Sequence, residues 1–295
     1  MKVLVTGATG YIGSAVCEAL KAAGHQPQGL ARSEDKAHLL ESKGFVARRG
    51  DLTDPDSLRA AVADADAVIH AADAAGPERG AIAKAAVGAM LSALAGSKRA
   101  FVYTSGVWVV GDTDGRMVGE ICALHPPELV SWRPAVEEMV LESKSSGVRP
   151  VVLRPGVVYG RGGGIVGSLF ADAREYGAVR IIGKGANCWS SVHIDDLADL
   201  YVRAVTEPAS GELFFACGGM PQPQEKIARA VAKACGLEGR IESIPLEVAR
   251  EHIGLVADCL AMDCRAGSTK AARYFGWTVT KPLIFDEILA GSYLS

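Results

Sequence analysis

Short, continuously apolar runs recur along the first half of the chain, and stretches with helical spacing separate them. We expect strands at residues 3–6, 28–31, 45–47, 67–70, 100–103 and 150–153, and helices near residues 14–23 and 134–143. Strands without polar alternation are typical of a parallel sheet that is covered by helices on both faces. The pattern therefore predicts an α/β fold, a Rossmann-type doubly wound parallel sheet.

After Pro155 the pattern loosens. Gly-rich segments occupy residues 160–167 and 183–185, and we then expect a helix from about Asp195, a strand at 213–216 and helices at 224–235 and 246–253. Ligands of open α/β sheets bind beyond the carboxyl ends of the strands, so later segments that cross these ends would supply the substrate side. We predict a Rossmann domain at 1–158 and a smaller C-terminal region at 159–295 that mostly binds substrate, with 192–218 returning to the Rossmann core.

Composition narrows the classes of partner. Of the 295 residues, 49% are apolar and 22% are charged, and the net charge is −3 without a long run of like charges. Such a chain has enough apolar material for a sizeable core and lacks the footprint of a nucleic-acid or membrane-binding protein. The seven cysteines form no C-x-x-C pair or Cys/His cluster, which indicates a reduced, cytoplasmic protein without a metal site. We expect a small-molecule partner.

A glycine-rich turn follows the first expected strand. The turn and the start of the next helix contain Gly7, Thr9, Gly10, Tyr11, Ile12 and Gly13. Glycine is needed there for a tight turn, for close approach of the backbone to a pyrophosphate, and for close packing of helix on strand, with the helix N-terminus facing the anion. A purely structural turn is the alternative, but the strand before it and the helix after it favour dinucleotide binding.

The residues after the second expected strand bear on the choice of coenzyme. An NAD site places Asp or Glu there to bind the ribose 2′-hydroxyl, whereas this chain has Arg32 and Ser33. A guanidinium binds a 2′-phosphate through charge-assisted hydrogen bonds. The pattern favours NADP(H), with NAD(H) as the alternative if Arg32 is only a solvated surface charge.

Asp51 and Leu52 follow the third expected strand. Asp51 is placed to contact adenine, or equally to cap the helix that Pro55 helps to start. The sequence favours neither of these two interpretations over the other.

Further motifs are TGATGYIG at 6–13, GDL at 50–52, HAA at 70–72, TSG at 104–106, RPGVVYG at 154–160 and VHIDDLA at 192–198. Together they resemble the extended short-chain dehydrogenase/reductases, in their NAD(P)-dependent epimerase/dehydratase branch. The resemblance covers most of the chain and weakens after about residue 220. It implies that Ala71 and Ala72 lie beside the cofactor, that Ser105 contacts substrate or nicotinamide, and that the protein is a homodimer.

One motif of that family is absent. The family usually carries Tyr-x-x-x-Lys on the helix after the fifth strand, and alignment on Glu137 and Glu138 puts Leu129 and Arg133 at these positions. Leucine donates no proton, and an arginine stays protonated. We expect Arg133 to hold ribose hydroxyls, a phosphate or a substrate carboxylate, unless it is a surface residue beside Pro134.

Carbonyl reduction would then need another proton donor. Ser105 follows the fifth strand, and Tyr159 ends an apolar run. Each has a structural alternative, a turn residue for Ser105 and a packed ring for Tyr159. His193 is suited to acid catalysis near pH 7, but it precedes Asp195 and Asp196, which predict an N-cap, so a structural histidine is favoured.

Several residues are candidates for the substrate side. Arg161 lies in the Gly-rich segment 160–164, interpreted either as a mobile flap with Arg161 directed inward or as a flexible turn. Trp108 and Trp132 would form an aromatic wall above the nicotinamide, or pack in the core. Trp189 is expected to face the substrate together with Cys188, unless Cys188 is a small buried hydrophobe.

Three functions are compatible with these residues. The first is an NADP(H)-dependent oxidoreductase for a small carbonyl, alcohol or activated alkene, with Ser105, Arg133 and Tyr159 as catalytic candidates. The second is an epimerase, dehydratase or lyase in which Arg133 binds an anionic substrate. The third is a catalytically silent NADP(H)-binding sensor.

Overall fold

The computed structural model describes residues 1–294, which form two compact units. The first unit contains Met1–Ser105, Trp132–Leu153 and Ala198–Phe214, and the second contains Gly106–Ser131, Arg154–Leu197 and the chain from Phe215. Residues 106–131, assigned above to the Rossmann domain, thus belong to the second unit. Of the segment 192–218, residues 198–214 return to the first.

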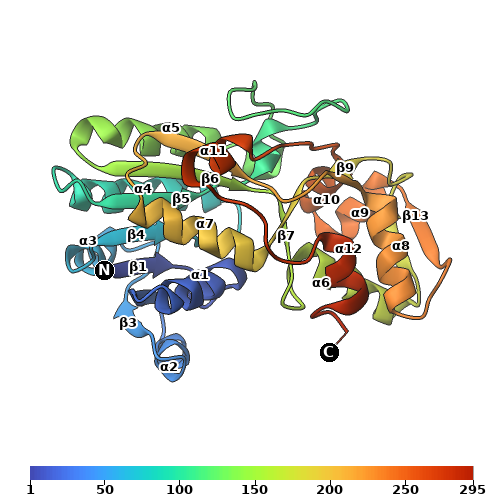
Figure 1. Ribbon diagram of the computed structural model, residues 1–295, viewed down its shortest axis with the longest axis horizontal. Helices are drawn as coiled ribbons and strands as arrows, with labels where there is room; N and C mark the ends of the chain where they lie inside the picture. The colour runs from blue at the N-terminus through green and yellow to red at the C-terminus, as the bar shows by residue number, and fades with distance from the viewer. Residues whose placement is uncertain (295) are drawn as a thin grey trace. The chain divides into compact units, whose positions relative to one another are not determined.

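A seven-stranded sheet in the order β11-β6-β5-β4-β1-β2-β3 forms the centre of the fold (Figure 1). Its strands are β1 Lys2–Thr6, β2 Gln26–Ala31, β3 Val46–Arg49, β4 Ala67–His70, β5 Ala100–Thr104, β6 Arg149–Pro155 and β11 Glu212–Ala216. All pairings from β3 to β6 are parallel. The strand order reverses beside β1, where doubly wound sheets bind their ligands. The predicted Rossmann-type sheet is confirmed.

Helices cover this sheet. They are α1 Tyr11–Ala22, α2 Glu34–Ser42, α3 Pro55–Ala63, α4 Arg79–Leu94, α5 Arg133–Glu142 and α7 Ile194–Thr206, and the 3₁₀ turn η3 Ser143–Ser146 extends α5. Leu58, Met90 and Val140, from α3, α4 and α5, share one apolar cluster with Leu4 and Phe101 of the sheet. Figure 1 shows α7 crossing the near side of the sheet. α1 begins three residues before its predicted start, since Gly10 is its N-cap.

The second unit is built from short strands and helices. Its strand pairs are β7 Val157–Tyr159 with β10 Ser191–His193, β8 Val179–Ile182 with β13 Ile241–Ile244, and β9 Cys188–Trp189 with β12 Gln222–Pro223. Its helices are η1 Val107–Val110, η2 Glu128–Val130, α6 Gly164–Tyr176, α8 Gln224–Ala234, α9 Leu246–Ile253, α10 Val256–Ala261, α11 Thr269–Phe275 and α12 Ile284–Ala290. Val166, Phe170, Ile227 and Ile288 lie in its apolar core.

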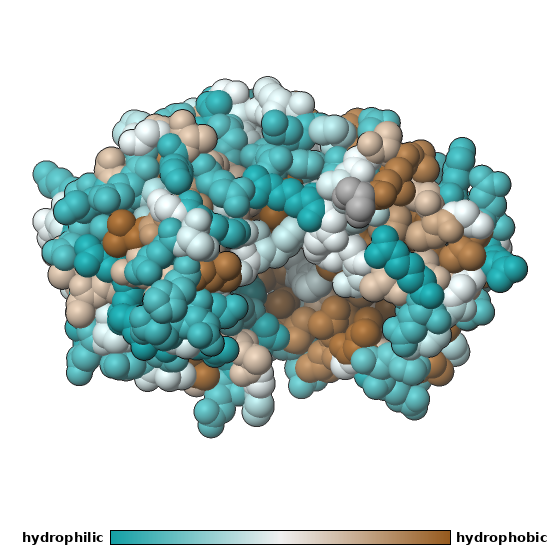
Figure 2. All heavy atoms as spheres, turned by 90° about the horizontal axis from the view of Figure 1, so that it is seen from below, coloured by the Kyte–Doolittle hydropathy of each residue, from teal (hydrophilic) through white to brown (hydrophobic). Residues whose placement is uncertain are grey.

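The exterior is mixed in polarity. In the face drawn in Figure 2, hydrophilic side chains cover most of the surface and apolar side chains gather in a few groups. No helix within residues 1–294 combines the length and the apolar character that crossing a bilayer requires.

Candidate functional site: a cavity at the carboxyl ends of the strands

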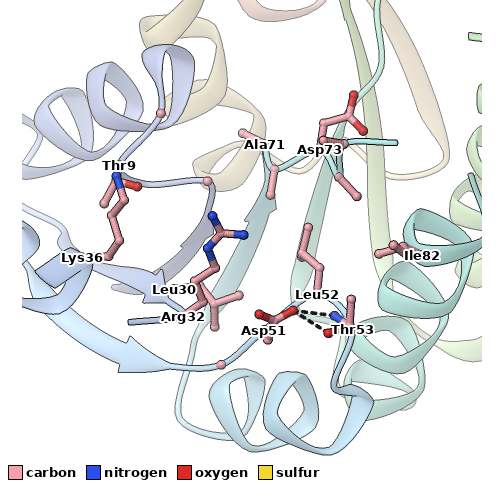
Figure 3. A pocket seen from close by; sticks show the side chains of 16 residues that line it. Thr9, Leu30, Arg32, Lys36, Asp51, Leu52, Thr53, Ala71, Asp73 and Ile82 are labelled. Atoms are coloured by element: carbon pink, nitrogen blue, oxygen red, sulfur yellow. Dashed lines mark hydrogen bonds between the residues drawn. The ribbon is translucent and has the colours of Figure 1, made fainter. Parts of the chain in front are cut away.

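A cavity of about 660 Å³ lies at the carboxyl ends of β1 to β4 in the first unit (Figure 3). Eight of the expected cofactor residues line it: Gly7, Thr9, Gly10, Arg32, Asp51, Leu52, Ala71 and Ala72. The cavity is also lined by residues that the sequence did not predict as part of the site, among them Leu30, Lys36, Thr53, Asp73 and Ile82. The fold therefore joins the turn after β1, the end of β2 and the loops after β3 and β4 in one site.

The glycine turn packs so closely against its neighbours that two of its positions have no room for a side chain. Gly7 has a φ of +70°, and a Cβ built on it would lie 2.7 Å from the carbonyl oxygen of Ala71. A Cβ on Gly13 would lie 2.1 Å from the carbonyl oxygen of Gly7. The turn can therefore lie against the end of β4, and α1 against the turn, only with glycine at both positions.

The N-terminus of α1 suits an anion. Its N-cap, Gly10, lines the cavity. In the described part of the chain no side chain caps this helix, and no acidic residue stands in its first turn. Its positive dipole end thus meets the cavity without a carboxylate in the helix's own first turn. Tyr11 and Ile12 begin the helix and are not among the described lining residues.

Two cations reach the cavity, Arg32 from the residue after β2 and Lys36 from the first turn of α2. Arg32 and Lys36 both line it, and both are exposed. Figure 3 shows the guanidinium of Arg32 directed toward the middle of the cavity. Ser33 has a structural role, because its hydroxyl accepts a hydrogen bond from the backbone N–H of Lys36 and caps α2.

Asp51 is held by its neighbour. Its Oδ1 accepts hydrogen bonds from the backbone N–H of Thr53 at 2.8 Å and from the Thr53 hydroxyl at 2.7 Å. These bonds, with a smaller contribution from Arg32, lower the pKa of Asp51. The residue that caps α3 is Asp54, which accepts from the backbone N–H of Ser57 at 3.2 Å. The helix-cap interpretation of Asp51 is therefore wrong.

Arg133 is fixed at the ends of β4 and β5. Its Nη1 donates to the carbonyl oxygen of Thr104 at 3.2 Å, and its Nη2 donates to Oδ2 of Asp73 at 2.9 Å. The same oxygen of Asp73 accepts from Arg79 at 2.6 Å. The guanidinium of Arg133 also lies over the ring of Trp132, 4.9 Å from its centroid. Arg133 is therefore not a solvated surface residue, and Trp132 packs on it.

Thr104 and Ser105 place two hydroxyl groups at the carboxyl end of β5. The Thr104 hydroxyl lies 2.6 Å from the Tyr201 hydroxyl, and burial raises the pKa of Tyr201. Ser105 is buried, and its Oγ has no hydrogen-bond partner among the described residues. Sequence reasoning did not find Tyr201, because nothing in the spacing of α7 shows which of its residues faces β5.

Tyr159 and His193 are packed side chains of the second unit. The Tyr159 hydroxyl donates to the carbonyl oxygen of Pro282 at 3.0 Å, and burial raises the pKa of Tyr159. Nδ1 of His193 accepts from the backbone N–H of Asp195 at 3.1 Å, and burial lowers the pKa of His193. Asp195 and Asp196 lie in the first turn of α7, which begins before them, so the predicted N-cap is wrong.

The Gly-rich segment is fastened to the rest of the second unit. Arg161 donates from Nε to Oδ1 of Asp195 at 2.8 Å. The hydroxyl of Tyr293 accepts from the backbone N–H of Gly160 at 2.7 Å and donates to the carbonyl oxygen of Gly163 at 2.9 Å. α6 begins at the next residue. These contacts favour a turn over a flap with Arg161 directed at a substrate, because Arg161 is engaged by a carboxylate.

The burial of the tryptophans bears on the predicted substrate side, and the aromatic wall of Trp108 and Trp132 stays a prediction. Trp189 is 1% exposed and donates from Nε1 to the carbonyl oxygen of Leu260 at 3.0 Å, so it lies in the core rather than toward a substrate. Cys188 beside it is buried as well. Trp108 is half-buried in η1 of the second unit, whereas Trp132 belongs to the first.

The cavity fits a nicotinamide dinucleotide. The glycine cradle and the helix N-terminus suit a pyrophosphate, and Asp51 lies beside Leu52 at the end of β3. Within residues 1–294 no group of three or more His, Cys, Asp or Glu side chains is arranged to hold a metal ion. Fold and cavity together define a dinucleotide-binding protein of the Rossmann class.

The particular family follows from comparison with known sequences. The model of the NAD dependent epimerase/dehydratase family matches residues 3–216, and the chain belongs to this family. An uncharacterized protein of Schizosaccharomyces pombe is 32% identical over 99% of this chain and 100% of its own length.

Named relatives and solved structures extend the comparison. A 2'-dehydrokanamycin reductase of Streptomyces kanamyceticus is 32% identical over 86% of this chain and 72% of the relative. A 2-alkyl-3-oxoalkanoate reductase of Stenotrophomonas maltophilia is 27% identical over 88% of this chain and 83% of the relative. The UDP-glucuronic acid 4-epimerase of Bacillus cereus has the same fold, with a TM-score of 0.83, 22% identity, and coverage of 100% of this chain and 99% of that chain.

Proposed function

We propose that the protein is an NADP(H)-dependent oxidoreductase that acts on a small carbonyl, alcohol or activated alkene. The observation that carries the coenzyme preference is the pair of cations after β2 and in the first turn of α2. Arg32 and Lys36 line the cavity where an NAD site would place a carboxylate. A 2′-phosphate would gain charge-assisted hydrogen bonds from them, whereas a 2′-hydroxyl would lack its acceptor.

Relatives support the redox part of the proposal. The 2'-dehydrokanamycin reductase and the 2-alkyl-3-oxoalkanoate reductase are both reductases by name. When bound, a nicotinamide coenzyme supplies or accepts a hydride. The chain itself then has to bind the coenzyme, orient it and place a hydrogen-bond donor at the oxygen of the substrate.

The described residues divide these tasks. Arg133, held by Asp73 and by the carbonyl oxygen of Thr104, presents a fixed guanidinium for ribose hydroxyls. Ser105 has a buried and unpartnered hydroxyl that would donate to a substrate oxygen. Tyr159 no longer qualifies as a donor, because its hydroxyl is bonded to Pro282.

A second candidate function is a catalytically silent NADP(H)-binding sensor. It is favoured by Leu129, which occupies the family's tyrosine position in η2 and has no proton to give. Both candidates bind NADP(H), but only the oxidoreductase converts a substrate, so measurements of coenzyme binding and of substrate turnover distinguish them.

Titration of NADPH and NADH, followed by nicotinamide fluorescence, tests the coenzyme preference. We expect NADPH to bind at least tenfold more tightly, and equal affinity would overturn the role given to Arg32. NADPH consumption is then measured with a panel of small ketones, aldehydes and enones. Turnover of any member supports the oxidoreductase, and tight binding without turnover on the whole panel supports the sensor.

A further inference from the structure

A second cavity, of about 430 Å³, lies within the second unit. It is lined by residues of α6, β8, the first residue of α8, the end of β13, and α9 with α10. The aliphatic part of its lining includes Ile165, Leu169, Ile182, Ile244, Val256 and Leu260. Its volume and apolar lining are those of a site for a small organic molecule.

One polar atom in this lining is left without a partner. Gln224 is 2% exposed, and its Oε1 has no hydrogen-bond partner among the described residues. The backbone N–H of Gln224 donates to the carbonyl oxygen of Asn187 at 2.9 Å, which fixes the start of α8. Buried acceptors are nearly always paired, because an unpaired one loses its hydration without compensation. A ligand that donates a hydrogen bond would remove this deficit.

The arginine of the lining is already paired with an aspartate. Nε of Arg180 donates to Oδ1 of Asp172 at 2.9 Å, and its guanidinium lies over the ring of Tyr176 at 3.7 Å. Among the described lining residues, no other guanidinium or ammonium group is present. The other titratable side chains of the lining, Glu175 and His252, are exposed to solvent, and the buried aliphatic part of the lining favours an uncharged ligand.

We propose that this cavity binds a small, uncharged and mainly aliphatic alcohol, whose hydroxyl donates to Oε1 of Gln224. The aliphatic lining buries the hydrocarbon part, and the amide oxygen selects for the hydroxyl. This inference goes beyond the proposed function, because it concerns a different cavity and does not depend on turnover or on coenzyme preference.

Calorimetric titration of the full chain tests the proposal with two probes, 1-octanol and octyl methyl ether, which lacks the donor. We expect saturable binding of 1-octanol at one site and about tenfold weaker binding of the ether. Gln224→Leu should reduce the affinity for 1-octanol to that for the ether. Gln222→Leu is the matched control, because the Gln222 amide donates to Met220 outside the cavity, and this variant should bind like the native chain.

A second variant covers the case in which Gln224→Leu fails to fold. Ser168 is exposed on α6 and lines the cavity, so Ser168→Trp should fill the opening and abolish 1-octanol binding with unchanged affinity for NADPH. The proposal is overturned if the native chain shows no saturable binding of 1-octanol, or if Ser168→Trp leaves it intact. Tighter binding of UDP than of 1-octanol, blocked by Ser168→Trp, would also overturn it and assign the cavity to a nucleotide.

Discussion

Asp73 and Arg133 are joined by a hydrogen bond of 2.9 Å, although 60 residues separate them in the chain. The carboxylate of Asp73 also accepts from Arg79, so one negative group holds two guanidinium groups at the end of β4. Asp73 itself lines the dinucleotide cavity. It therefore fixes the direction of Arg133 and limits the positive charge that this edge presents.

Asp73→Asn should lower the free energy of unfolding by about 1 kcal/mol, because both partner guanidinium groups are largely buried and would be left side by side. Urea unfolding measures the loss. Asp56→Asn is the control, since its pair with Arg59 lies on an exposed helix surface, and it should cost little. Equal losses in the two variants would show that the Asp73 pair is no stronger than a surface pair.

Arg32→Glu should reverse the coenzyme preference from NADPH to NADH. We expect affinity for NADPH to fall about 100-fold, through loss of a charge-assisted hydrogen bond and repulsion of the phosphate, and affinity for NADH to rise. Fluorescence titration with both coenzymes gives the ratio. Lys84→Glu changes the net charge equally at an exposed position of α4. If this control shifts the ratio as much as Arg32→Glu does, Arg32 has no specific role.

Two glycines in helices should respond to alanine in opposite ways. Gly13→Ala should destabilise the protein by about 3 kcal/mol, because the new Cβ would meet the Gly7 carbonyl at 2.1 Å. Gly88→Ala in α4 should stabilise it by about 1 kcal/mol, since its Cβ has nothing within 4 Å. Thermal unfolding of both variants checks the signs, and a stable Gly13→Ala variant with native NADPH affinity would contradict the close fit of α1 on the turn.

His70 should make stability depend on pH below neutrality. Burial, with a smaller contribution from Arg133, lowers the pKa of His70 to about 4. Because the unfolded chain takes up this proton near pH 6.5 and the native chain does not, the stabilisation is complete above pH 6.5 and is lost as pH falls toward 4. Between pH 7 and pH 5 the native protein should lose about 2 kcal/mol more than His70→Asn.

Urea unfolding at the two pH values measures the contribution of His70. Asn keeps a polar group near the Thr6 hydroxyl, which lies 2.8 Å from Nδ1 of His70. His252→Asn, at an exposed position, is the control and should follow the native protein. An identical pH dependence in His70→Asn and the native chain would refute the assignment.

The parallel Rossmann-type sheet and the glycine cradle could be predicted from sequence, because both depend on local features such as short apolar runs and glycines at fixed spacing. The sequence of α4 contains no comparable pattern from which a helix could be predicted. α4 packs against α3 and α5 with one side and exposes Ala81, Lys84, Ala85 and Ser92 on the other. Because alanine occupies exposed and buried positions alike, the contrast between a polar and an apolar face that identifies a surface helix is weak.

The site was predictable only where a residue follows a strand directly, as Arg32 and Asp51 do. The partners of Arg133 and Thr104 were not predictable, because Asp73 and Tyr201 come from distant segments that only the packed fold brings together. Trp189 is a residue for which the sequence predicts a role in the site that the structure does not support. The sequence places this aromatic residue among polar neighbours and so predicts that it faces a substrate, whereas its indole N–H donates to a carbonyl oxygen within the core.

The bonds between Tyr293 and the segment at 160–163 have a consequence for the newly made protein. Tyr293 lies 133 residues after Gly160 and 130 after Gly163. At about 5–20 residues per second, translation produces this tyrosine roughly ten seconds after the glycines. During that interval the emerging segment lacks these two hydrogen bonds, which form only after the part of the chain that contains Tyr293 has been made.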